Sequence, residues 1–349
     1  MNFASDNVYG VDQAIMDAMV KANTGTSASY AYDDITTRVE SQFNEVFERE
    51  VKVFLMTTGT AANSLALSTM APPFGAIFCH AYSHINADEC GAPEFYTGGA
   101  KMFGLDGVAG KISPQMIRDS LNGFIRGEHD PKAAAISITQ SSELGTVYSL
   151  DEIAAFGDLA REKNLKLHMD GARFANALVS LGCSPAEMTW KRGVDALSFG
   201  ATKNGAMGVE AVVFFDLNLA KDFEYRRMRG GHLLSKNRYL AAQMEAYLTN
   251  DLWLNNARHA NDMAKRLADG LSSVEGMHLG VEQQANEVFV IMPKAKHDAL
   301  EKTDAVFHQW LASGSDTAPV GPDEIMIRLV TSFLTTIEDV DGFIALAAG

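Results

Sequence analysis

Three polar side chains in this sequence follow apolar runs that are typical of buried strands. Lys203 lies in "SFGATKNGAMG", where small residues on both sides leave its ammonium group uncrowded. Asp170 ends the run "LKLHMD", and a carboxylate buried there would need a cationic partner. His84 follows the run "AIFCH". Taken singly, each residue has an ordinary alternative: a solvated lysine, a helix N-cap or a structural histidine.

A fourth feature is a segment that suits an anion. A strand-like run leads into "TTGTAANSLAL", so a helix would begin near Gly59 and Thr60. The N–H groups of a helix's first turn and the helix dipole attract anions, and glycine lets the backbone approach closely. Neither a Walker loop nor a GxGxxG turn occurs, which argues against an NAD-binding dehydrogenase. The simpler alternative is a plain threonine N-cap.

These four features share one explanation. Pyridoxal 5′-phosphate (PLP) requires a phosphate site, a lysine for its Schiff base and an acidic partner for its pyridinium nitrogen. In an α/β sheet such groups gather at the carboxyl ends of the strands. The order of an anion site, His84, Asp170 and Lys203 at such ends therefore predicts a PLP site in which Lys203 attacks the cofactor's aldehyde.

The elements that would position these residues alternate between strand-like and helix-like segments. The apolar runs cover 53–57, 76–80, 133–139, 165–170, 196–200 and 210–216. Amphipathic stretches over 113–124 and 149–164 lie between them, and Ser149 with Glu152 forms a capping-box pattern. Continuous apolar strands separated by helices predict a mostly parallel sheet that is covered on both faces.

The pattern changes after about residue 217, which indicates a second, smaller α+β domain. We expect a long helical stretch over 238–271, strands over 278–281, 287–293 and 324–332, a helix over 295–313 and a last helix near the end. No linker rich in Pro, Gly or Ser separates the two parts, so they should pack closely. We place the large domain at 1–245 and the small domain at 246–349.

The composition limits the partners of the chain. With 29 Lys and Arg against 44 Asp and Glu, the net charge is −15, whereas nucleic-acid binding needs clustered cations. The three cysteines form no CxxC pair, which argues against zinc and is typical of a reducing compartment. The sequence has no apolar run of the ~20 residues that span a bilayer and no secretory signal. We therefore expect a cytoplasmic protein with no metal and no nucleic-acid or membrane partner.

Seven motifs resemble, in the same order, those of the low-specificity L-threonine aldolases, PLP enzymes of fold type I grouped with the β-eliminating lyases. They are "SDN" (5–7), "YAYDDITTRVE" (30–40), "TTGTAANSLAL" (57–67), "SHINADECGAPE" (83–94), "HMDGARFANAL" (168–178), "SFGATKNGAMG" (198–208) and "IRLVTSF" (327–333). The HxDGAR element followed by Lys203 is the most specific part. The resemblance covers essentially the whole chain. It implies a large domain with a mostly parallel seven-stranded sheet covered by helices, and a smaller C-terminal α+β domain.

The resemblance also implies a role for each matching residue at the cofactor. Lys203 would form the Schiff base, Asp170 would pair with the pyridine nitrogen, and His84 would stack on the ring. The residues that would hold the phosphate or otherwise contact the cofactor are Gly59, Thr60, Arg173, Ser198 and Thr202. The catalytic set is thus Lys203, His84 and Asp170.

Further positions would serve the substrate or a neighbouring subunit. Ser5, Arg173 and Arg328 would hold the substrate carboxylate, and paired guanidinium donors suit that group. Tyr30 matches a tyrosine that reaches the neighbour's site in a tight dimer, and Glu89 matches an acid beside the stacking histidine. The resemblance implies a homodimer or homotetramer with shared active sites.

Two segments depart from the family pattern. The stretch "TQSSELGTVY" (139–148) carries Glu143 where many members have a histidine. The stretch "RGGHLLSK" (229–236) replaces a glycine-rich segment, and Arg229 or Lys236 would take over its contacts. These variants resemble the branch that includes phenylserine-type aldolases, so the preferred β-substituent stays open.

The expected reaction is retro-aldol cleavage of L-threonine, L-allo-threonine or a related β-hydroxy-α-amino acid to glycine and an aldehyde. The base for the β-hydroxyl would be His84, directly or through water, with Glu89, Glu143 or a bound water as alternatives. Other PLP reactions on amino acids, namely β-elimination, transamination and hydroxymethyl transfer, would use the same lysine and aspartate. A non-catalytic relative that binds PLP, or nothing, is the remaining alternative.

Overall fold

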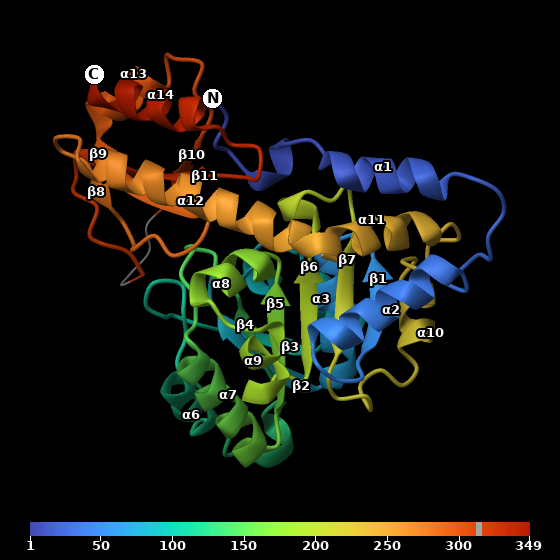
Figure 1. The fold of residues 1–349 in the computed structure, drawn as a ribbon. Coiled ribbons are helices and arrows are strands. Elements are labelled where there is room, and N and C mark those ends of the chain that lie inside the picture. Colours follow the sequence, from blue (N-terminus) through green and yellow to red (C-terminus); the bar gives the residue numbers. More distant parts are fainter. Residues whose placement is uncertain (312–315) are drawn as a thin grey trace.

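A seven-stranded sheet forms the centre of the protein in a computed structural model that describes residues 1–311 and 316–349 (Figure 1). Its strand order is β1-β7-β6-β5-β4-β2-β3. The strands are β1 (Lys52–Met56), β2 (Gly75–His80), β3 (Lys101–Leu105), β4 (Lys132–Thr139), β5 (Lys166–Gly171), β6 (Ala196–Gly200) and β7 (Glu210–Phe214). Only β7 runs against its neighbours, because β2 to β6 pair in parallel. The predicted mostly parallel sheet is therefore confirmed.

Helices cover both faces of this sheet, which explains why its strands are almost continuously apolar. One face packs against α3 (Gly59–Met70), α5 (Ala92–Thr97) and α10 (Phe223–Arg229). The other face packs against α2 (Asp34–Val46), α6 (Pro114–Leu121), α7 (Leu150–Lys163), α8 (Phe174–Leu181), α9 (Pro185–Met188) and α11 (Arg238–Leu248). Along β1, Val53 and Leu55 face the second layer while Phe54 and Met56 face the first. The predicted capping box of Ser149 and Glu152 starts α7.

A four-stranded antiparallel sheet, ordered β10-β11-β9-β8, forms the smaller part of the fold. Its elements are α12 (Leu252–Ser272), β8 (His278–Leu279), β9 (Glu287–Pro293), α13 (Lys294–Leu300), β10 (His308–Trp310), β11 (Glu324–Val330) and α14 (Ile337–Ala348). The N-terminus joins this part, because the N–H of Phe3 donates to the carbonyl of Val306 at 2.8 Å and the N–H of Val330 donates to the carbonyl of Phe3 at 2.9 Å. Figure 1 accordingly shows both termini beside α14.

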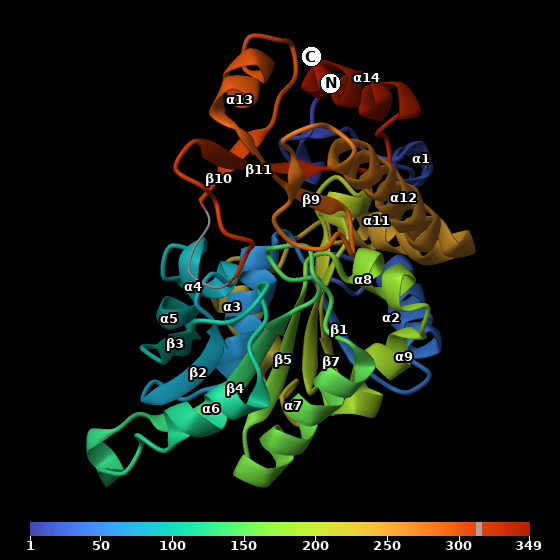
Figure 2. The same cartoon turned by 90° about the vertical axis from the view of Figure 1, so that its left-hand side faces the viewer.

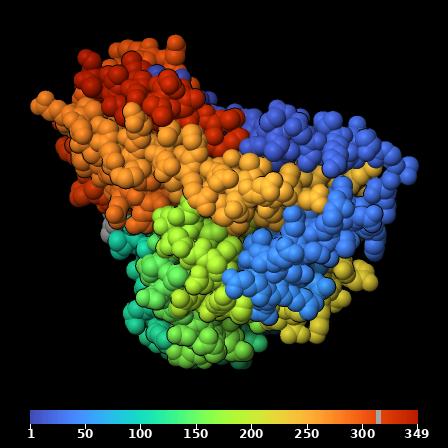
Figure 3. Space-filling view, in the orientation of Figure 1, coloured from blue at the N-terminus to red at the C-terminus, as the bar shows by residue number. Residues whose placement is uncertain are grey.

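The two parts pack directly on each other, as Figures 2 and 3 show. The first half of α12, with Trp253 and Ala257, lies in the core of the large sheet. Its second half, with Met263 and Leu267, lies in the core of the small sheet. One continuous helix therefore serves both cores, and the division at 245 and 246 stays a proposal. Within the described residues, no helix is both long and apolar enough to cross a membrane.

Some expected elements have different limits. The stretch predicted as one helix over 238–271 is two helices, because Asn250 and Asp251 adopt left-handed conformations in the turn η5 (Thr249–Asp251). The helix predicted over 295–313 ends at Leu300, and His308–Trp310 instead pairs with β11; residues 312 and 313 lie outside the described residues. Helices α1 (Gln13–Ala22) and α2 and strand β3 were not expected.

Candidate active site

A cavity of about 340 Å³ lies at the carboxyl ends of the central strands. In Figure 1 the arrow of β5 points toward this end, where α12 crosses the sheet. The predicted residues that line the cavity are Gly59, Thr60, His84, Asp170, Arg173, Ser198, Thr202 and Lys203. They come from the start of α3, the segment after β2, and the ends of β5 and β6. The fold thus brings together the anion site, the histidine, the aspartate and the lysine.

The N-terminus of α3 offers an open anion site at one side of the cavity. Thr58 is the N-cap residue, and its side chain accepts a hydrogen bond from the N–H of Ala61 at 3.2 Å. A Cβ added at Gly59 would meet no protein atom within 4 Å. Gly59 is therefore not required for packing within the protein, and it leaves space at the helix dipole that an anion such as a phosphate can fill.

Asp170 is a buried carboxylate with neutral donors only. Its exposed fraction is 3%. One oxygen accepts from Asn63 Nδ2 at 2.8 Å, and the other accepts from the N–H of Ala172 at 3.0 Å. No cation of the described residues makes an ion pair with Asp170, although a buried charge normally requires one. The site therefore suits a cationic ligand group, such as a protonated pyridine nitrogen.

Lys203 lies in the 3-10 turn η4 (Thr202–Asn204) directly after β6. It lines the cavity and makes no ion pair within the described part of the chain. The turn needs a glycine at position 205 for two reasons. The φ of Gly205 is 119°, which other residues rarely adopt, and an added Cβ would lie 3.0 Å from Asn256 Nδ2. Glu210 supports the same turn by accepting from the N–H of Ala201 at 3.0 Å, and burial raises the pKa of Glu210 to about 7. An unpaired amine in a polar cavity suits covalent capture of an aldehyde.

His84 begins the short helix α4 (His84–Ala87) and is held by two carboxyl groups. Its Nδ1 bonds Glu89 Oε1 at 2.9 Å, and its backbone N–H donates to Glu143 Oε1 at 2.8 Å. The bond to Glu89 raises the pKa of His84 above its usual range, against the opposite effect of burial. The side chain is still 42% exposed, so the ring keeps surface for a ligand.

Glu143 is the second titratable group on this wall of the cavity. Thr139 donates to its Oε1 at 3.0 Å, while its buried Oε2 has no hydrogen-bond partner among the described residues. Burial raises the pKa of Glu143 to about 7. Glu143 can therefore exchange a proton near neutral pH.

Arg173 reaches the cavity already paired with two buried carboxylates. Its Nε and Nη2 donate to Asp6 at 2.8 and 3.1 Å, and its Nη1 lies 3.2 Å from Glu287 Oε2. Burial alone would raise the pKa of Asp6, but the charges of Arg173 and Lys203 outweigh it and hold that pKa below its usual range. The guanidinium is thus fixed in place, and carboxylates already contact it.

Ser5 and Arg328, predicted to bind the substrate carboxylate with Arg173, do not line the cavity itself. The hydroxyl of Ser5 accepts from the N–H of Asn7 at 3.1 Å, and Asn7 does line the cavity. Arg328, on β11, donates to the carbonyl of Ala4 at 3.3 Å and stacks over the Trp310 ring at 5.0 Å. Its buried Nε has no hydrogen-bond partner in the part of the chain that the structure describes. Both residues thus lie along the N-terminal segment next to the cavity.

Tyr30, Arg229 and Lys236 also lie away from the cavity walls. Tyr30 is 46% exposed and its N–H donates to the carbonyl of Ser235 at 3.0 Å. Arg229 lines a separate cavity beside Tyr96. Lys236 is exposed. Within a single chain these three residues do not complete the site.

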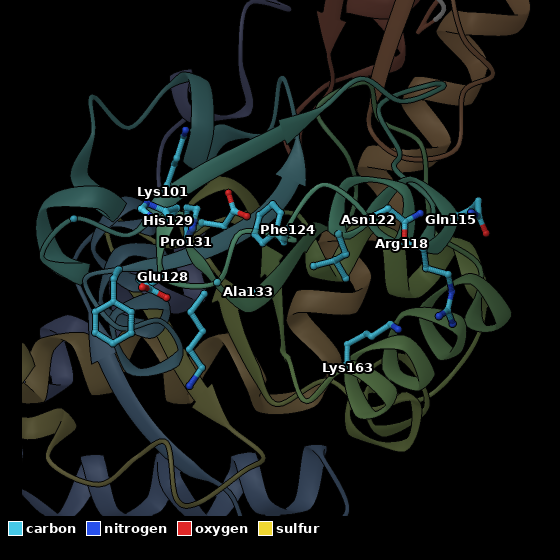
Figure 4. Close-up of a pocket in the computed structure, with 17 residues that line it drawn as sticks. Lys101, Gln115, Arg118, Asn122, Phe124, Glu128, His129, Pro131, Ala133 and Lys163 are labelled. Carbon is cyan, nitrogen blue, oxygen red and sulfur yellow. The ribbon is translucent and has the colours of Figure 1, made fainter.

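A larger cavity of about 1200 Å³ lies at the opposite ends of β2 and β4 (Figure 4). Its lining includes Lys101, Arg118 and Lys163 but none of the residues predicted for chemistry. Arg118 is paired with Glu162 at 2.6 Å. The candidate active site is therefore the smaller cavity.

The comparisons with known proteins show the family of the chain. Residues 2–295 match the model of the β-eliminating lyase family. The chain belongs to this family. A relative from Pseudomonas aeruginosa named low specificity L-threonine aldolase is 42% identical over 313 residues, which cover 89% of this chain and 90% of the relative. A relative of the same name from Escherichia coli is 26% identical, over 83% of this chain and 84% of the relative.

The solved structures also place this β-eliminating lyase family member in a known fold. The threonine aldolase of Leishmania major matches with a TM-score of 0.91 and 27% identity, over 99% of this chain and 98% of that one. The serine palmitoyltransferase of Sphingomonas wittichii matches with a TM-score of 0.70 at 18% identity, over 100% of this chain and 86% of that one, and so shares the fold. The predicted family and the predicted fold class, PLP fold type I, are confirmed.

Some site residues of this β-eliminating lyase family member were not predicted. Asn63 and Glu210 line the cavity, and Asp6 and Glu287 hold Arg173. His168 bonds the hydroxyls of Ser137 and Ser198 at 2.9 and 3.0 Å, and burial lowers its pKa to about 4, so it is neutral. Asn63, Asp6 and His168 all lie within the motifs that resemble the family, and this was the sequence feature that could have identified them as site residues.

Proposed function

We propose that this protein is a PLP-dependent aldolase that cleaves L-threonine, L-allo-threonine or a related β-hydroxy-α-amino acid to glycine and an aldehyde. One observation carries the proposal: neither buried Asp170 nor Lys203 forms an ion pair with any described residue, and both line one cavity with the N-terminus of α3. The relatives' names and the family support the same reaction. When bound, PLP supplies an acceptor for the electron pair that remains at Cα when the Cα–Cβ bond breaks.

The cavity residues fit this cofactor. Gly59 and Thr60 at the start of α3 would hold the phosphate, and Lys203 would hold the aldehyde carbon covalently. Asp170 would face the pyridine nitrogen and keep that atom protonated, because an opposing charge raises the pKa of a cationic group. His84 would lie against the ring face. Thr202 and Ser198 would add hydroxyl donors, although Ser198 already has His168 as a partner.

The substrate carboxylate would be held by Arg173, Arg328 and Ser5. Arg173 is fixed by Asp6 and Glu287, so its orientation is set before a substrate arrives. A carboxylate clamped by two guanidinium groups restricts rotation about the bond between the substrate nitrogen and Cα. Aldol chemistry requires that this restriction present the Cα–Cβ bond for cleavage and not the Cα–H bond.

Cleavage also requires a base that takes the proton from the β-hydroxyl as the aldehyde C=O forms. We propose His84, whose Nε2 has no hydrogen-bond partner among the described residues. Glu143 is the alternative on the same wall, because no described residue bonds its Oε2 and burial raises its pKa to about 7.

Paired variants separate these two bases. His84→Phe keeps a ring against the cofactor and removes the base, so we expect aldehyde release to fall by about a hundredfold or more. Glu143→Gln keeps the acceptor for the His84 N–H and is expected to retain most activity. The rates are followed by an aldehyde-linked assay with L-threonine and phenylserine. Near-normal turnover in His84→Phe with a large loss in Glu143→Gln would assign the base to Glu143 instead.

A product assay tests the reaction itself. Incubation with PLP and L-threonine, L-allo-threonine or L-phenylserine is expected to give glycine and the matching aldehyde in equal amounts. A keto acid and ammonia without aldehyde would indicate β-elimination. Absence of product with every amino acid, together with no visible absorption after PLP is added, would indicate a non-catalytic relative.

We further propose a cytoplasmic homodimer or homotetramer in which Tyr30 reaches the neighbour's site, with Arg229 and Lys236 near the same interface. Tyr30 and Tyr32 are 46% and 84% exposed in the single chain. Neighbouring aromatic side chains exposed in this way support a surface that another subunit covers. Light scattering is expected to give two or four times the mass of one chain.

Mixing two inactive variants tests the shared site. In a hybrid of Tyr30→Ala and Lys203→Ala subunits, one site would receive both an intact lysine and an intact tyrosine. Unfolding and refolding the mixture should therefore restore about a quarter of the wild-type activity. No recovery would mean that Tyr30 serves its own chain, and full activity of Tyr30→Ala alone would mean that it serves no site.

A further inference from the structure

Asn63 joins two buried carboxylates through a single amide group. It lies one turn into α3 and is 2% exposed. Its Nδ2 donates to Asp170 Oδ2 at 2.8 Å and to Glu89 Oε1 at 2.9 Å. Asp170 and Glu89 are themselves 3% and 4% exposed. Both N–H groups of the amide are therefore used, one for each carboxylate.

The same contacts connect the two groups that would lie against the cofactor. Glu89 Oε1 also bonds His84 Nδ1 at 2.9 Å, so the order of the network is His84, Glu89, Asn63 and Asp170. His84 would contact the ring face and Asp170 the ring nitrogen. The other charged or titratable groups near this network are Lys203 and Glu143. A neutral hydroxyl, Ser64 Oγ, also lies 3.5 Å from Glu89 Oε2.

An amide has the chemistry that this position requires. A lysine or arginine at position 63 would neutralise Asp170, which would then attract a cationic ligand less. An aliphatic residue would remove the donor that Asp170 and Glu89 share and leave each buried carboxylate with one hydrogen bond fewer, which is costly. Turning the amide around would place Oδ1 against both carboxylates, so the network fixes its orientation. The Oδ1 atom has no partner, which leaves the two carboxylates as the only hydrogen-bond partners of this side chain within the described residues.

We propose that Asn63 is a positioning residue that couples the His84–Glu89 pair to Asp170, because its one amide group holds both buried carboxylates and so supports the charge of His84. This inference rests on the proposed function for the roles of His84 and Asp170 at the cofactor. The coupling itself is a property of the protein without cofactor, because all four side chains are already connected.

The direction of the coupling follows from the contacts. Burial raises the pKa of Glu89, while the hydrogen bonds from His84 and Asn63 oppose that rise. Without the amide, Glu89 is protonated more easily and supports the charge of His84 less. We therefore expect Asn63→Ala to lower the pKa of His84 by roughly half a unit to one unit. Asp170 also loses a donor, and we expect PLP affinity to fall about tenfold.

Two measurements on the full chain test the proposal. The titration of the His84 imidazole is followed by NMR before PLP is added, with the signal assigned by its loss in His84→Phe. PLP affinity is followed by its visible absorption. Asn63→Ser keeps one donor, so it should lower the pKa of His84 by a smaller amount. This variant replaces Asn63→Ala in the test if Asn63→Ala does not fold. Ser68→Ala, a buried hydroxyl on the same helix that bonds the carbonyl of Leu65, should leave both quantities unchanged.

The outcomes distinguish the inference from the proposed function. An unchanged His84 titration in a folded Asn63 variant would overturn the coupling, whatever the activity. Failure of the wild-type chain to bind PLP would overturn the proposed function but leave the NMR test of the coupling valid. A shift of His84 in both Asn63 variants, absent from Ser68→Ala, would support it.

Discussion

Replacing Lys203 with alanine is expected to reduce aldehyde release from L-threonine by on the order of a thousandfold or more. Lys203 is the one lysine among the described residues that line the candidate site, and small neighbours and Gly205 leave its amine accessible. We expect the chain without it still to bind PLP through α3 and Asp170, but no side-chain amine would remain among the described lining residues to bond the aldehyde carbon. The loss should therefore appear in the rate far more than in PLP affinity.

Chemical trapping locates the lysine independently of activity. After PLP is added and the protein is reduced with borohydride, mass spectrometry should place the added mass on the peptide that contains Lys203. The added mass should be absent from that peptide in Lys203→Ala. Lys265→Ala is a matched control, because Lys265 pairs with Asp269 on the exposed side of α12 and should leave both labelling and rate unchanged. Labelling of a different residue, or none, would contradict the whole assignment.

The central sheet was predicted well from the sequence because strands that are buried on both faces consist of continuous apolar runs. The expected strands over 196–200 and 133–139 differ from β6 and β4 by at most one residue at an end. Strand β3 was missed because "KMFGL" is a short edge segment whose pairing with β2 supplies the order. His308–Trp310 was misassigned to a helix for a similar reason: its partner β11 lies later in the chain and determines its structure.

Of the site, only the residues that lie at or just after the ends of strands could be predicted from the sequence. Parallel strands end at one edge, so His84, Asp170 and Lys203 had to lie near one another. The pairing of Arg173 with Asp6 spans 167 residues, and no local pattern indicates it. Asn63 was visible as a polar residue in a helix of small and apolar side chains, but its two acceptors come from other elements. Long-range side-chain partners of this kind require the fold.

Replacing Asp170 with asparagine is expected to lower the rate of aldehyde release by about a hundredfold, and by up to a thousandfold. The change keeps the shape of the side chain, and the amide oxygen can still accept from the N–H of Ala172. It removes the charge that would keep the pyridine nitrogen protonated. Since an opposing charge shifts a pKa by roughly 1–3 units, the population of the active form falls by one to three powers of ten at a given pH.

The charge and not the burial of Asp170 should account for this loss. Asp195→Asn is the matched control, because Asp195 also adjoins the central sheet and accepts from the N–H of Leu167 at 2.8 Å, but lies outside the cavity. We expect that variant to lose stability while its rate per bound cofactor stays close to wild type. In Asp170→Asn the remaining rate should rise as the pH falls, because a lower pH protonates the nitrogen without help from a carboxylate. A rate in Asp170→Asn equal to wild type at neutral pH would show that the ring nitrogen does not need this partner.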